Sequence, residues 1–331
     1  MILPSEKEIM GSWSKRKVTP TVSICCATYN QADYIESALR GFLIQKTKFH
    51  FEILIRDDAS TDGTALIIRE YQMRYPNIIR LRIETENQFL LGIKPAEYFF
   101  ATSRAKYIAW CDGDDYWTDP RKLQEQVKFL DENEEYVVVG HRVKNFIEAT
   151  DEMTEADFYK TDGSRGDLMR CGVYAPTSTR LHRHLIKILP GEFKRVIYGD
   201  LVINSILGQY GKYKYLKYIQ PSVRVVRENS VAAGSSIKVH SENHLITHFW
   251  LYKYHLRHER VEIANGHFSK YLLWTEKRLA SSVGKKYFRE QLITIKNKLS
   301  NKELVSLLDG RFLVLYGIPE IFKKMIKRIF L

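Results

Sequence analysis

The sequence predicts an α/β protein with a mostly parallel sheet flanked by helices, followed by a helical C-terminal segment. Short apolar, β-favouring runs alternate with amphipathic helical patterns, and each of three runs ends in a polar loop. The 331 residues are 44% hydrophobic, which is enough for a large core. Charged residues make up 27%, and no apolar run is long enough to span a bilayer, so disordered, fibrous and membrane-spanning classes are excluded.

The first part of the chain predicts three strands and two helices. Asp33 is a plausible N-cap for the first helix, and Pro76 closes the second. In order, the expected elements are strand 21–27, helix 34–43, strand 51–55, helix 65–75 and strand 78–83.

The pattern continues and then weakens. A short helix opens at Pro95, followed by strand 107–111, helix 120–133 and strand 136–139. Residues 148–170 lack periodicity and are expected to form loops over the sheet. A helix over 201–207, entered through an acidic loop, and strand material over 213–226 follow.

These patterns divide the chain into an N-terminal extension (1–19), an α/β domain (20–240) and a basic helical segment (241–331). The net charge is +12, and the last segment holds 17 Lys and Arg against 8 Asp and Glu. Such an excess suggests a polyanionic partner, either nucleic acid or an anionic membrane face. The start lacks an apolar stretch of signal-peptide length, and the four cysteines lack metal or redox spacing, so we expect a cytoplasmic protein with reduced cysteines.

Two acidic segments follow expected strands. Asp57-Asp58 ends the second strand, and Asp112-Gly113-Asp114-Asp115 ends the fourth. Aspartates also make turns and caps, and for an isolated pair that explanation is the more frequent one. Here both segments fall at the carboxyl edge, where parallel sheets bind ligands, and clustered carboxylates there favour a divalent cation and a nucleotide diphosphate.

These residues resemble the inverting family 2 glycosyltransferases, whose fold is called GT-A and is a Rossmann-like nucleotide-sugar-binding fold. The similar pieces are Val22 to Ile24 running to Thr28-Tyr29-Asn30, Asp57 to Thr64, and Asp112 to Trp117. The resemblance covers about residues 20–230 and is strongest up to Trp117. It implies transfer of a sugar from a nucleotide-sugar donor, with inversion at the anomeric carbon.

The resemblance also implies roles for individual residues. Thr28, Asn30 and Asp57 would surround the base and ribose, with Asp58 and Asp115 supporting these loops. Asp112 would contact ribose or metal beside Gly113, and Asp114 would be the main ligand of Mg²⁺ or Mn²⁺.

Asp200, ahead of an apolar helix, resembles the general base of the family. On position alone, an N-cap of helix 201–207 is an equal alternative. Inverting transfer needs a carboxylate that takes the acceptor proton on one face and a cation that neutralises the leaving diphosphate on the other. Two separate acidic sites would meet that need.

One departure from the family concerns a histidine that often follows the base helix. The corresponding stretch, 223–230, contains Arg224 and Arg227 instead, and either guanidinium could meet the diphosphate. Trp117, with Tyr116, and Thr179 in the segment 174–179 are candidate acceptor contacts, although a core aromatic and an ordinary loop explain them as well.

Two features of the last segment remain open. A helix over 321–330 with apolar and cationic faces suggests contact with anionic lipid, and a plain packing helix is an equal alternative. His240, His244 and His248 share one helical face, but interleaved aromatic residues favour packing over a zinc site.

We therefore expect an inverting transferase that uses a nucleotide-diphosphate sugar, UDP-linked by preference, and a glycan or lipid-linked acceptor in cell-surface polysaccharide or capsule synthesis. A catalytically inactive module that binds nucleotide sugar or glycan is the alternative. Acidic clusters at the ligand edge oppose nucleic-acid binding. The loop after the first strand lacks the glycine fingerprint of a dinucleotide oxidoreductase.

Overall fold

A computed structural model describes residues 2–14, 19–156, 160–173, 175–227 and 237–279. The chain divides into two compact units, Met1–Gly234 and Ser235–Leu331. This boundary falls shortly before residue 240, where the sequence pattern changes.

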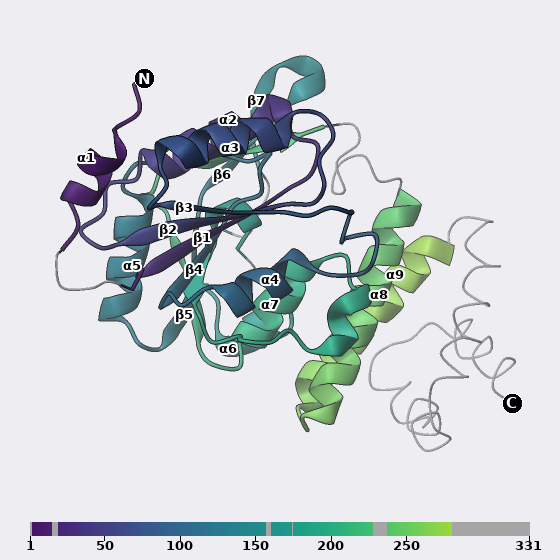
Figure 1. Ribbon diagram of the computed structural model, residues 1–331. Coiled ribbons are helices and arrows are strands. Elements are labelled where there is room, and N and C mark those ends of the chain that lie inside the picture. Colours follow the sequence, from purple (N-terminus) through teal and green to yellow (C-terminus); the bar gives the residue numbers. More distant parts are fainter. Residues whose placement is uncertain (1, 15–18, 157–159, 174, 228–236, 280–331) are drawn as a thin grey trace, which may run out of the picture. The chain divides into compact units, whose positions relative to one another are not determined.

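The first unit is built on a seven-stranded sheet in the order β3-β2-β1-β4-β8-β5-β9 (Figure 1). β1 pairs in parallel with β2 and β4, β2 with β3, and β5 with β9, whereas β8 is antiparallel to both its neighbours. The sheet is mostly parallel, as predicted. Its strands are β1 (Val22–Thr28), β2 (Phe51–Asp57), β3 (Ile79–Ile83), β4 (Tyr107–Trp110), β5 (Tyr136–His141), β8 (Leu181–Arg183) and β9 (Lys212–Leu216).

Helices cover both faces of this sheet, which is why the central strands are buried throughout. α2 (Ala32–Leu43) and α3 (Thr64–Arg74) lie on one side, and α4 (Pro95–Thr102) and α7 (Gly199–Leu207) on the other (Figure 1). Ile35, Leu39 and Phe42 of α2 join the core cluster of the first face. On the second face, Phe99 and Phe100 of α4 pack edge-on against Trp110. α5 (Lys122–Glu132) completes the helices predicted for the first half.

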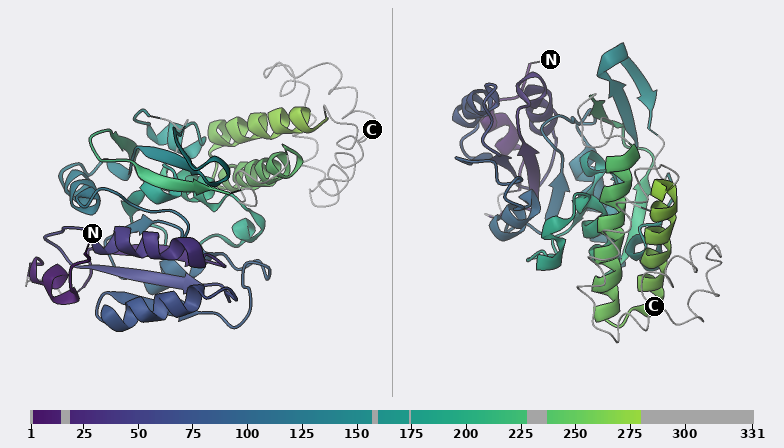
Figure 2. Two further views of the ribbon diagram at one scale, coloured as in Figure 1. Left: turned by 90° about the horizontal axis from the view of Figure 1, so that it is seen from above. Right: turned by 90° about the vertical axis from the view of Figure 1, so that its right-hand side faces the viewer.

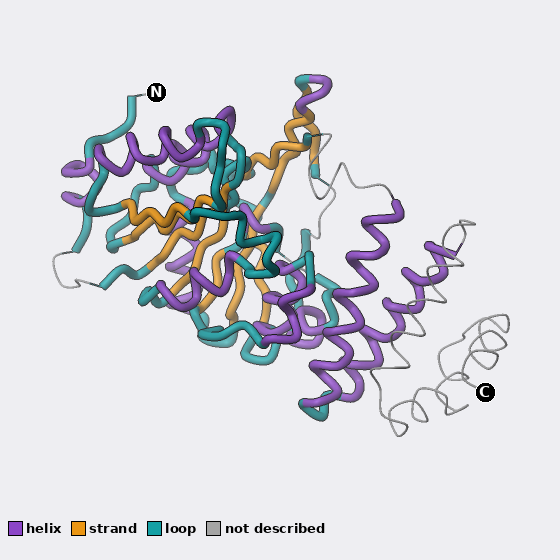
Figure 3. Tube along the Cα trace, turned by 45° about the vertical axis from the view of Figure 1, so that its right-hand side comes forward, coloured by secondary structure: helices purple, strands orange, loops and turns teal. Residues whose placement is uncertain are grey.

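A second, three-stranded sheet was not predicted. β6 (Val143–Ile147) pairs in parallel with β10 (Ser222–Val226) and antiparallel with β7 (Glu152–Glu155). Figure 3 shows β6 and β7 standing out from the main sheet as a hairpin. Residues 148–170, expected to be loops, thus contain β7, the short helix η1 (Glu148–Thr150) and α6 (Arg165–Met169).

The strand material expected over 213–226 forms two strands, β9 and β10, which belong to different sheets. The remaining short helices are η2 (Thr177–Thr179) and η3 (Gly191–Arg195). At the other end of the chain, α1 (Glu6–Gly11) packs on the core through Ile9, and Trp13 is also buried there. The N-terminal extension is therefore part of the first unit.

The described part of the second unit is a helical hairpin. α8 (Ile237–Arg257) and α9 (Val261–Leu279) run side by side (Figure 2). His248 and His267 lie between them, with their Nδ1 atoms 3.1 Å apart, and the His255 ring stacks on His267. Among the described residues, neither these helices nor any other is long and apolar enough to cross a membrane. The helix expected over 321–330 lies outside the described residues.

Candidate active site

The carboxyl ends of β1, β2 and β4 meet at one edge of the main sheet, because β1 lies between the other two and pairs with both in parallel. Backbone hydrogen bonds join their loops. The N–H of Asp58 donates to the Thr28 carbonyl over 2.9 Å, and the N–H of Gly113 donates to the Ala27 carbonyl over 2.9 Å. The two acidic segments therefore flank the end of β1.

Asn30 connects the β1 loop to the β2 loop. Its backbone has the left-handed conformation, with φ of 50°, which asparagine tolerates better than most residues. Its N–H donates to the Ser60 hydroxyl, and its side-chain carbonyl accepts from the N–H of Thr61, both over 2.8 Å. The side chain predicted to bind the nucleotide thus fixes the loop in which Asp57 lies.

Gly113 faces the end of β1. A Cβ atom at this position would lie 2.8 Å from Thr28 Oγ1 and 2.6 Å from Gln31 Oε1, so any other residue would force these side chains aside. Within the described chain, both of these buried oxygens lack a hydrogen-bond partner. Orphaned polar atoms at a ligand-binding edge are the groups that a bound ligand would satisfy.

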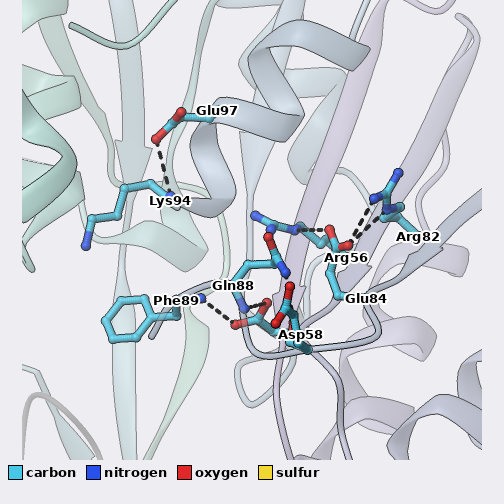
Figure 4. Close-up of polar contacts among 9 residues, drawn as sticks. Arg56, Asp58, Arg82, Glu84, Gln88, Phe89, Lys94 and Glu97 are labelled. Carbon is cyan, nitrogen blue, oxygen red and sulfur yellow. Dashed lines mark hydrogen bonds and ion pairs between the residues drawn. The ribbon is translucent and has the colours of Figure 1, made fainter. Parts of the chain in front are cut away.

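The β2 loop is stabilised by its own aspartates. Asp57 is fully buried and accepts from the N–H and hydroxyl of Ser60, over 3.1 and 2.5 Å. The Asp58 carboxylate accepts from the N–H groups of Gln88 and Phe89, over 2.9 and 3.0 Å (Figure 4). Asp58 therefore stabilises the loop that follows β3 through its carboxylate, and it is itself bonded to β1 through its N–H.

The β4 loop is different, because its carboxylates lie close enough to repel one another electrostatically. Burial, and then the charge of Asp114, raise the pKa of Asp112 to about 7. The pKa of Asp115 is raised well above its ordinary value, first by burial and then by Asp114 and Asp112. The Asp115 carboxylate accepts a hydrogen bond from the N–H of Val225 over 3.2 Å and so attaches this loop to β10.

Asp114 forms an ion pair with Arg227, whose guanidinium lies 2.5 Å from the carboxylate. The same guanidinium lies over the ring of Tyr34, 4.9 Å from its centroid, and the Tyr34 hydroxyl donates to Glu148. Both partners of the ion pair are largely buried, with 18% of Asp114 and 25% of Arg227 exposed. Of the two arginines proposed to meet the diphosphate, Arg227 forms an ion pair with the predicted metal ligand.

Asp200 is the second residue of α7 rather than its N-cap, which is Tyr198. Its carboxylate accepts from the N–H of Leu201 over 2.9 Å, so it lies at the positive end of the helix dipole. Its charge adds, after burial and Asp114, to the raised pKa of Asp112. The N-cap alternative is therefore wrong.

Arg180, which the sequence did not single out, lies between these two acidic positions. It is 1% exposed, its Nη1 is 3.4 Å from the Asp200 carbonyl, and it lies over the Trp110 ring, 5.6 Å from the centroid. Its charge lowers the pKa of Asp112 against the effects of burial and Asp114. A lone arginine before a three-residue strand gives no sequence signal of this role.

Two predicted acceptor contacts are wrong. Trp117 is 2% exposed, donates its indole N–H to the Ser178 carbonyl over 2.7 Å and lies against the Lys122 ammonium, 3.9 Å from the ring centroid. Thr179 is fully buried, and its hydroxyl donates to the Pro176 carbonyl over 2.9 Å. Both side chains are buried in the core. Burial lowers the pKa of Lys122 to about 7.

Residues 23–187 match the protein family described as glycosyl transferase family 2. An uncharacterized protein of Mycobacterium tuberculosis is 45% identical over 37% of this chain and 35% of its own length. The Escherichia coli UDP-Glc:alpha-D-GlcNAc-diphosphoundecaprenol beta-1,3-glucosyltransferase WfaP is 34% identical over 33% of this chain and 41% of its own length. The chain thus spans less than half the length of these relatives.

Two solved structures share the fold at low sequence identity. TarS 1–349 of S. aureus in complex with UDP is 17% identical, with a TM-score of 0.53 over 88% of this chain and 80% of that one. The Pyrobaculum calidifontis mannosyltransferase PcManGT, in complex with GDP-Man and Mn²⁺, is 16% identical, with a TM-score of 0.53 over 95% and 86%. With its parallel sheet and acidic carboxyl edge, the chain belongs to glycosyltransferase family 2 and has the GT-A fold of that family of transferases.

Proposed function

We propose that this chain transfers a sugar, with inversion, from a nucleotide-diphosphate sugar to a saccharide or lipid-linked saccharide. The observation that carries the proposal is that Thr28, Asp57, Asp112 and Asp114 lie at one edge of the sheet. Asp200 is close enough for its charge to raise the pKa of Asp112. UDP-sugars are the favoured donors, and cell-surface polysaccharide assembly at the cytoplasmic face of the plasma membrane is the setting that we propose.

The donor is expected to occupy the end of β1. The orphaned hydroxyl of Thr28 and the side-chain carbonyl of Gln31 can bond to the base and ribose. Asn30 and Asp57 keep the two loops in place through Ser60 and Thr61. Because Gly113 has no side chain, the β4 loop can pack closely against Thr28 and Gln31 at the end of β1.

The chemistry of the β4 loop fits a divalent cation. Mg²⁺ and Mn²⁺ prefer carboxylate oxygens and often use only one or two of them, together with phosphates and water. Asp112 and Asp114 are such a pair, and their mutual repulsion is of the kind that a cation relieves. When bound, the cation would neutralise charge on the leaving diphosphate. Among the described residues, no group of three or more metal-binding side chains exists, so the remaining ligands would come from the donor and water.

Arg227 and Asp200 complete the proposed chemistry. Arg227 lies beside Asp114 and can pair with the diphosphate, because a guanidinium matches phosphate oxygens in geometry and charge. Asp200 would accept the proton of the acceptor hydroxyl while that oxygen attacks the anomeric carbon and the bond to the diphosphate breaks. Arg180 supports α7 at the Asp200 carbonyl and limits the negative charge between the two sites.

The Arg227–Asp114 pair also favours a second candidate, a module that binds nucleotide sugar without turnover. In that case Arg227 would permanently replace the cation at Asp114. The two functions differ in whether a nucleoside diphosphate is released.

The first experiment is a thermal-shift panel of UDP-, GDP-, dTDP- and CMP-sugars with and without Mn²⁺, because a ligand that binds only the native state raises the melting temperature. We expect a Mn²⁺-dependent shift with one nucleotide class, UDP first. Release of nucleoside diphosphate in the presence of acceptor then identifies the transferase, and binding without release identifies the inactive module. The absence of a shift with every donor would contradict both.

A further inference from the structure

The backbone brings Arg227 and Asp114 together by joining the β4 loop to β10. The N–H of Tyr116 donates to the Val223 carbonyl over 3.0 Å, and the N–H of Val223 donates to the Tyr116 carbonyl over 2.8 Å. Asp114 precedes the first of these residues by two positions, and Arg227 follows the second by four. Their ion pair is therefore set by the pairing of two chain segments rather than by two mobile surface side chains.

The end of β6 supplies a second set of contacts. β6 and β10 are parallel, with Val226 opposite Ile147, so Arg227 and Glu148 follow the two strands at the same end. The guanidinium of Arg227 lies over the Tyr34 ring, and the Tyr34 hydroxyl donates to Glu148. Burial, and then this hydrogen bond, raises the pKa of Tyr34 to about 12, so the hydroxyl keeps its proton at neutral pH. Tyr34 thus supports the guanidinium while Asp114 binds it.

Arg227 has capacity for a further anion. A guanidinium has five N–H donors, and the Nη2 of Arg227 is the atom that bonds to Asp114. Its Nε is buried and has no hydrogen-bond partner in the described part of the chain. A buried donor of this kind indicates a place where a ligand can bind.

Arg227 and a divalent cation would use the same carboxylate. Asp114 is largely buried and its oxygen lies 2.5 Å from the guanidinium, so a cation can bind this oxygen only if the guanidinium moves. Movement without a new partner is unfavourable, because it leaves a largely buried charge unpaired. A diphosphate beside Asp114 removes that cost, because its oxygens match the guanidinium in charge and geometry.

We propose that Arg227 competes with the cation for Asp114 and leaves this carboxylate when a nucleoside diphosphate becomes its new partner. The cation and the nucleotide then bind cooperatively, each raising the affinity for the other by the same factor, and the site binds a cation alone poorly. This inference rests on the proposed function, because the cation and the diphosphate both belong to it. It adds a regulatory role for Arg227, which prevents the site from taking up a cation before the donor.

The test measures Mn²⁺ binding to the full chain from the electron paramagnetic resonance signal of free Mn²⁺, without nucleotide and with UDP or GDP. In wild type, we expect one of the nucleotides to tighten Mn²⁺ binding about tenfold or more. Arg227→Gln removes the competing charge, so Mn²⁺ without nucleotide should bind this variant about tenfold more tightly than wild type. The gain should be lost in Asp114→Asn/Arg227→Gln, because it requires the Asp114 carboxylate.

Arg224→Gln is the matched control. The charge of Arg224 lowers the pKa of Asp115, so this arginine also acts on the β4 loop, but its removal leaves the pair between Arg227 and Asp114 in place. Mn²⁺ without nucleotide should therefore gain much less affinity for this variant than for Arg227→Gln. An equal gain in the two variants would show a general effect of removing positive charge and would overturn the competition.

Three further results would overturn the proposal. The first is wild type that binds Mn²⁺ equally with and without both nucleotides, a result that requires no variant to fold. The second is Arg227→Gln that binds Mn²⁺ alone no better than wild type. The third is wild type that never binds Mn²⁺ although Arg227→Gln does, because Arg227 would then replace the cation permanently. Release of nucleoside diphosphate from a sugar donor is measured separately, and cooperative binding without release would contradict the proposed transfer but not the competition.

Discussion

Two aspartate-rich loops flank the end of β1, and the sequence presents them almost identically, as acidic residues after a buried strand. In the β2 loop, Asp57 and Asp58 each accept two hydrogen bonds from groups nearby. In the β4 loop, the Asp112 carboxylate accepts none from the described part of the chain, and the charges of Asp114 and Asp200 add to the burial that raises its pKa. The first loop uses its negative charge to build structure. In the second, among the described residues, the Asp112 carboxylate has no hydrogen-bond donor, and the charge of Arg180 offsets it only in part.

This difference distinguishes a loop that stabilises the fold, the β2 loop, from a loop that can bind a ligand, the β4 loop. A carboxylate whose oxygens are bonded to the protein stabilises the fold, and it has little capacity left for a ligand. A buried cluster without donors costs stability, so it persists in a structure that gains a cation or substrate there. Arg227 partly compensates the β4 loop through Asp114, which is why we expect this ion pair to respond to the donor.

The largest effect is expected at the third acidic position, Asp200. Asp200→Asn keeps the size of the side chain and an oxygen for the Leu201 N–H, but it removes the proton acceptor. Turnover should fall about a thousandfold, within the range of a lost general base, while the donor-induced thermal shift is unchanged. Initial rates of nucleoside diphosphate release measure the first effect. Loss of the thermal shift would instead place Asp200 in donor binding.

A smaller but metal-linked loss is expected at Asp114. Asp114→Asn removes the charge that the proposed cation and Arg227 share, so turnover should fall about a hundredfold. The Mn²⁺ dependence of donor binding should disappear with it. Asp162→Asn is the control, because Asp162 forms an exposed ion pair with Lys214 in another loop. Equal Mn²⁺ dependence in wild type and Asp114→Asn would contradict the assignment.

The fold was largely predictable because the signal is local. In the first half of the chain, apolar strands and amphipathic helices alternate over short distances, and each predicted strand up to residue 139 corresponds to β1–β5. Predictions failed where tertiary pairing decides. β8 has only three residues. β10 forms a strand by pairing with β6, and the paired residues Ser222 and Val143 are 79 positions apart in the sequence. A hydrophobic pattern over a few residues cannot indicate a strand partner so far away in the sequence.

For the site, too, the sequence predicted where residues lie but not which contacts they make. The positions of Asp57, Asp112 and Asp114 at a strand end indicated a shared edge, but hydrogen-bond donors are supplied by distant residues. Thus the sequence could not distinguish the satisfied Asp58 from Asp112, whose carboxylate has no hydrogen-bond donor among the described residues, nor show that Arg180 is buried beside α7. Trp117 and Thr179 were misassigned for the same reason, because burial depends on what packs above a side chain.

Substitution of Asp58 tests whether the β2 loop holds the loop after β3 in place. Asp58→Ala removes both bonds to the loop after β3, so the free energy of unfolding should fall by about 2 kcal/mol. Amide hydrogens of residues 84–93 should exchange faster, with little change at β5. Urea unfolding and hydrogen exchange measure the two effects. Unchanged exchange in this loop would show that its own turn, rather than Asp58, holds it.

The last prediction compares the two loops directly. The same substitution, aspartate to asparagine, should change the free energy of unfolding in opposite directions in the two loops. Asp57→Asn weakens the bonds from Ser60 and should destabilise the protein. Asp112→Asn removes a buried charge that has no hydrogen-bond donor among the described residues, and it should raise the free energy of unfolding at pH 8 in the absence of metal.

The pH dependence follows from the raised pKa of Asp112. Between about pH 4, near the ordinary value for aspartate, and about pH 7, the folded protein retains a proton at Asp112 that the unfolded chain has lost. Wild type therefore loses stability relative to Asp112→Asn as the pH rises through this window. The two should unfold alike at pH 4 and differ by a constant amount above pH 7. Urea unfolding across this range, with chelator present, measures the difference. A gap that stays constant down to pH 4 would mean that Asp112 is ionised throughout, and the contrast between the two loops would then rest on hydrogen bonding alone.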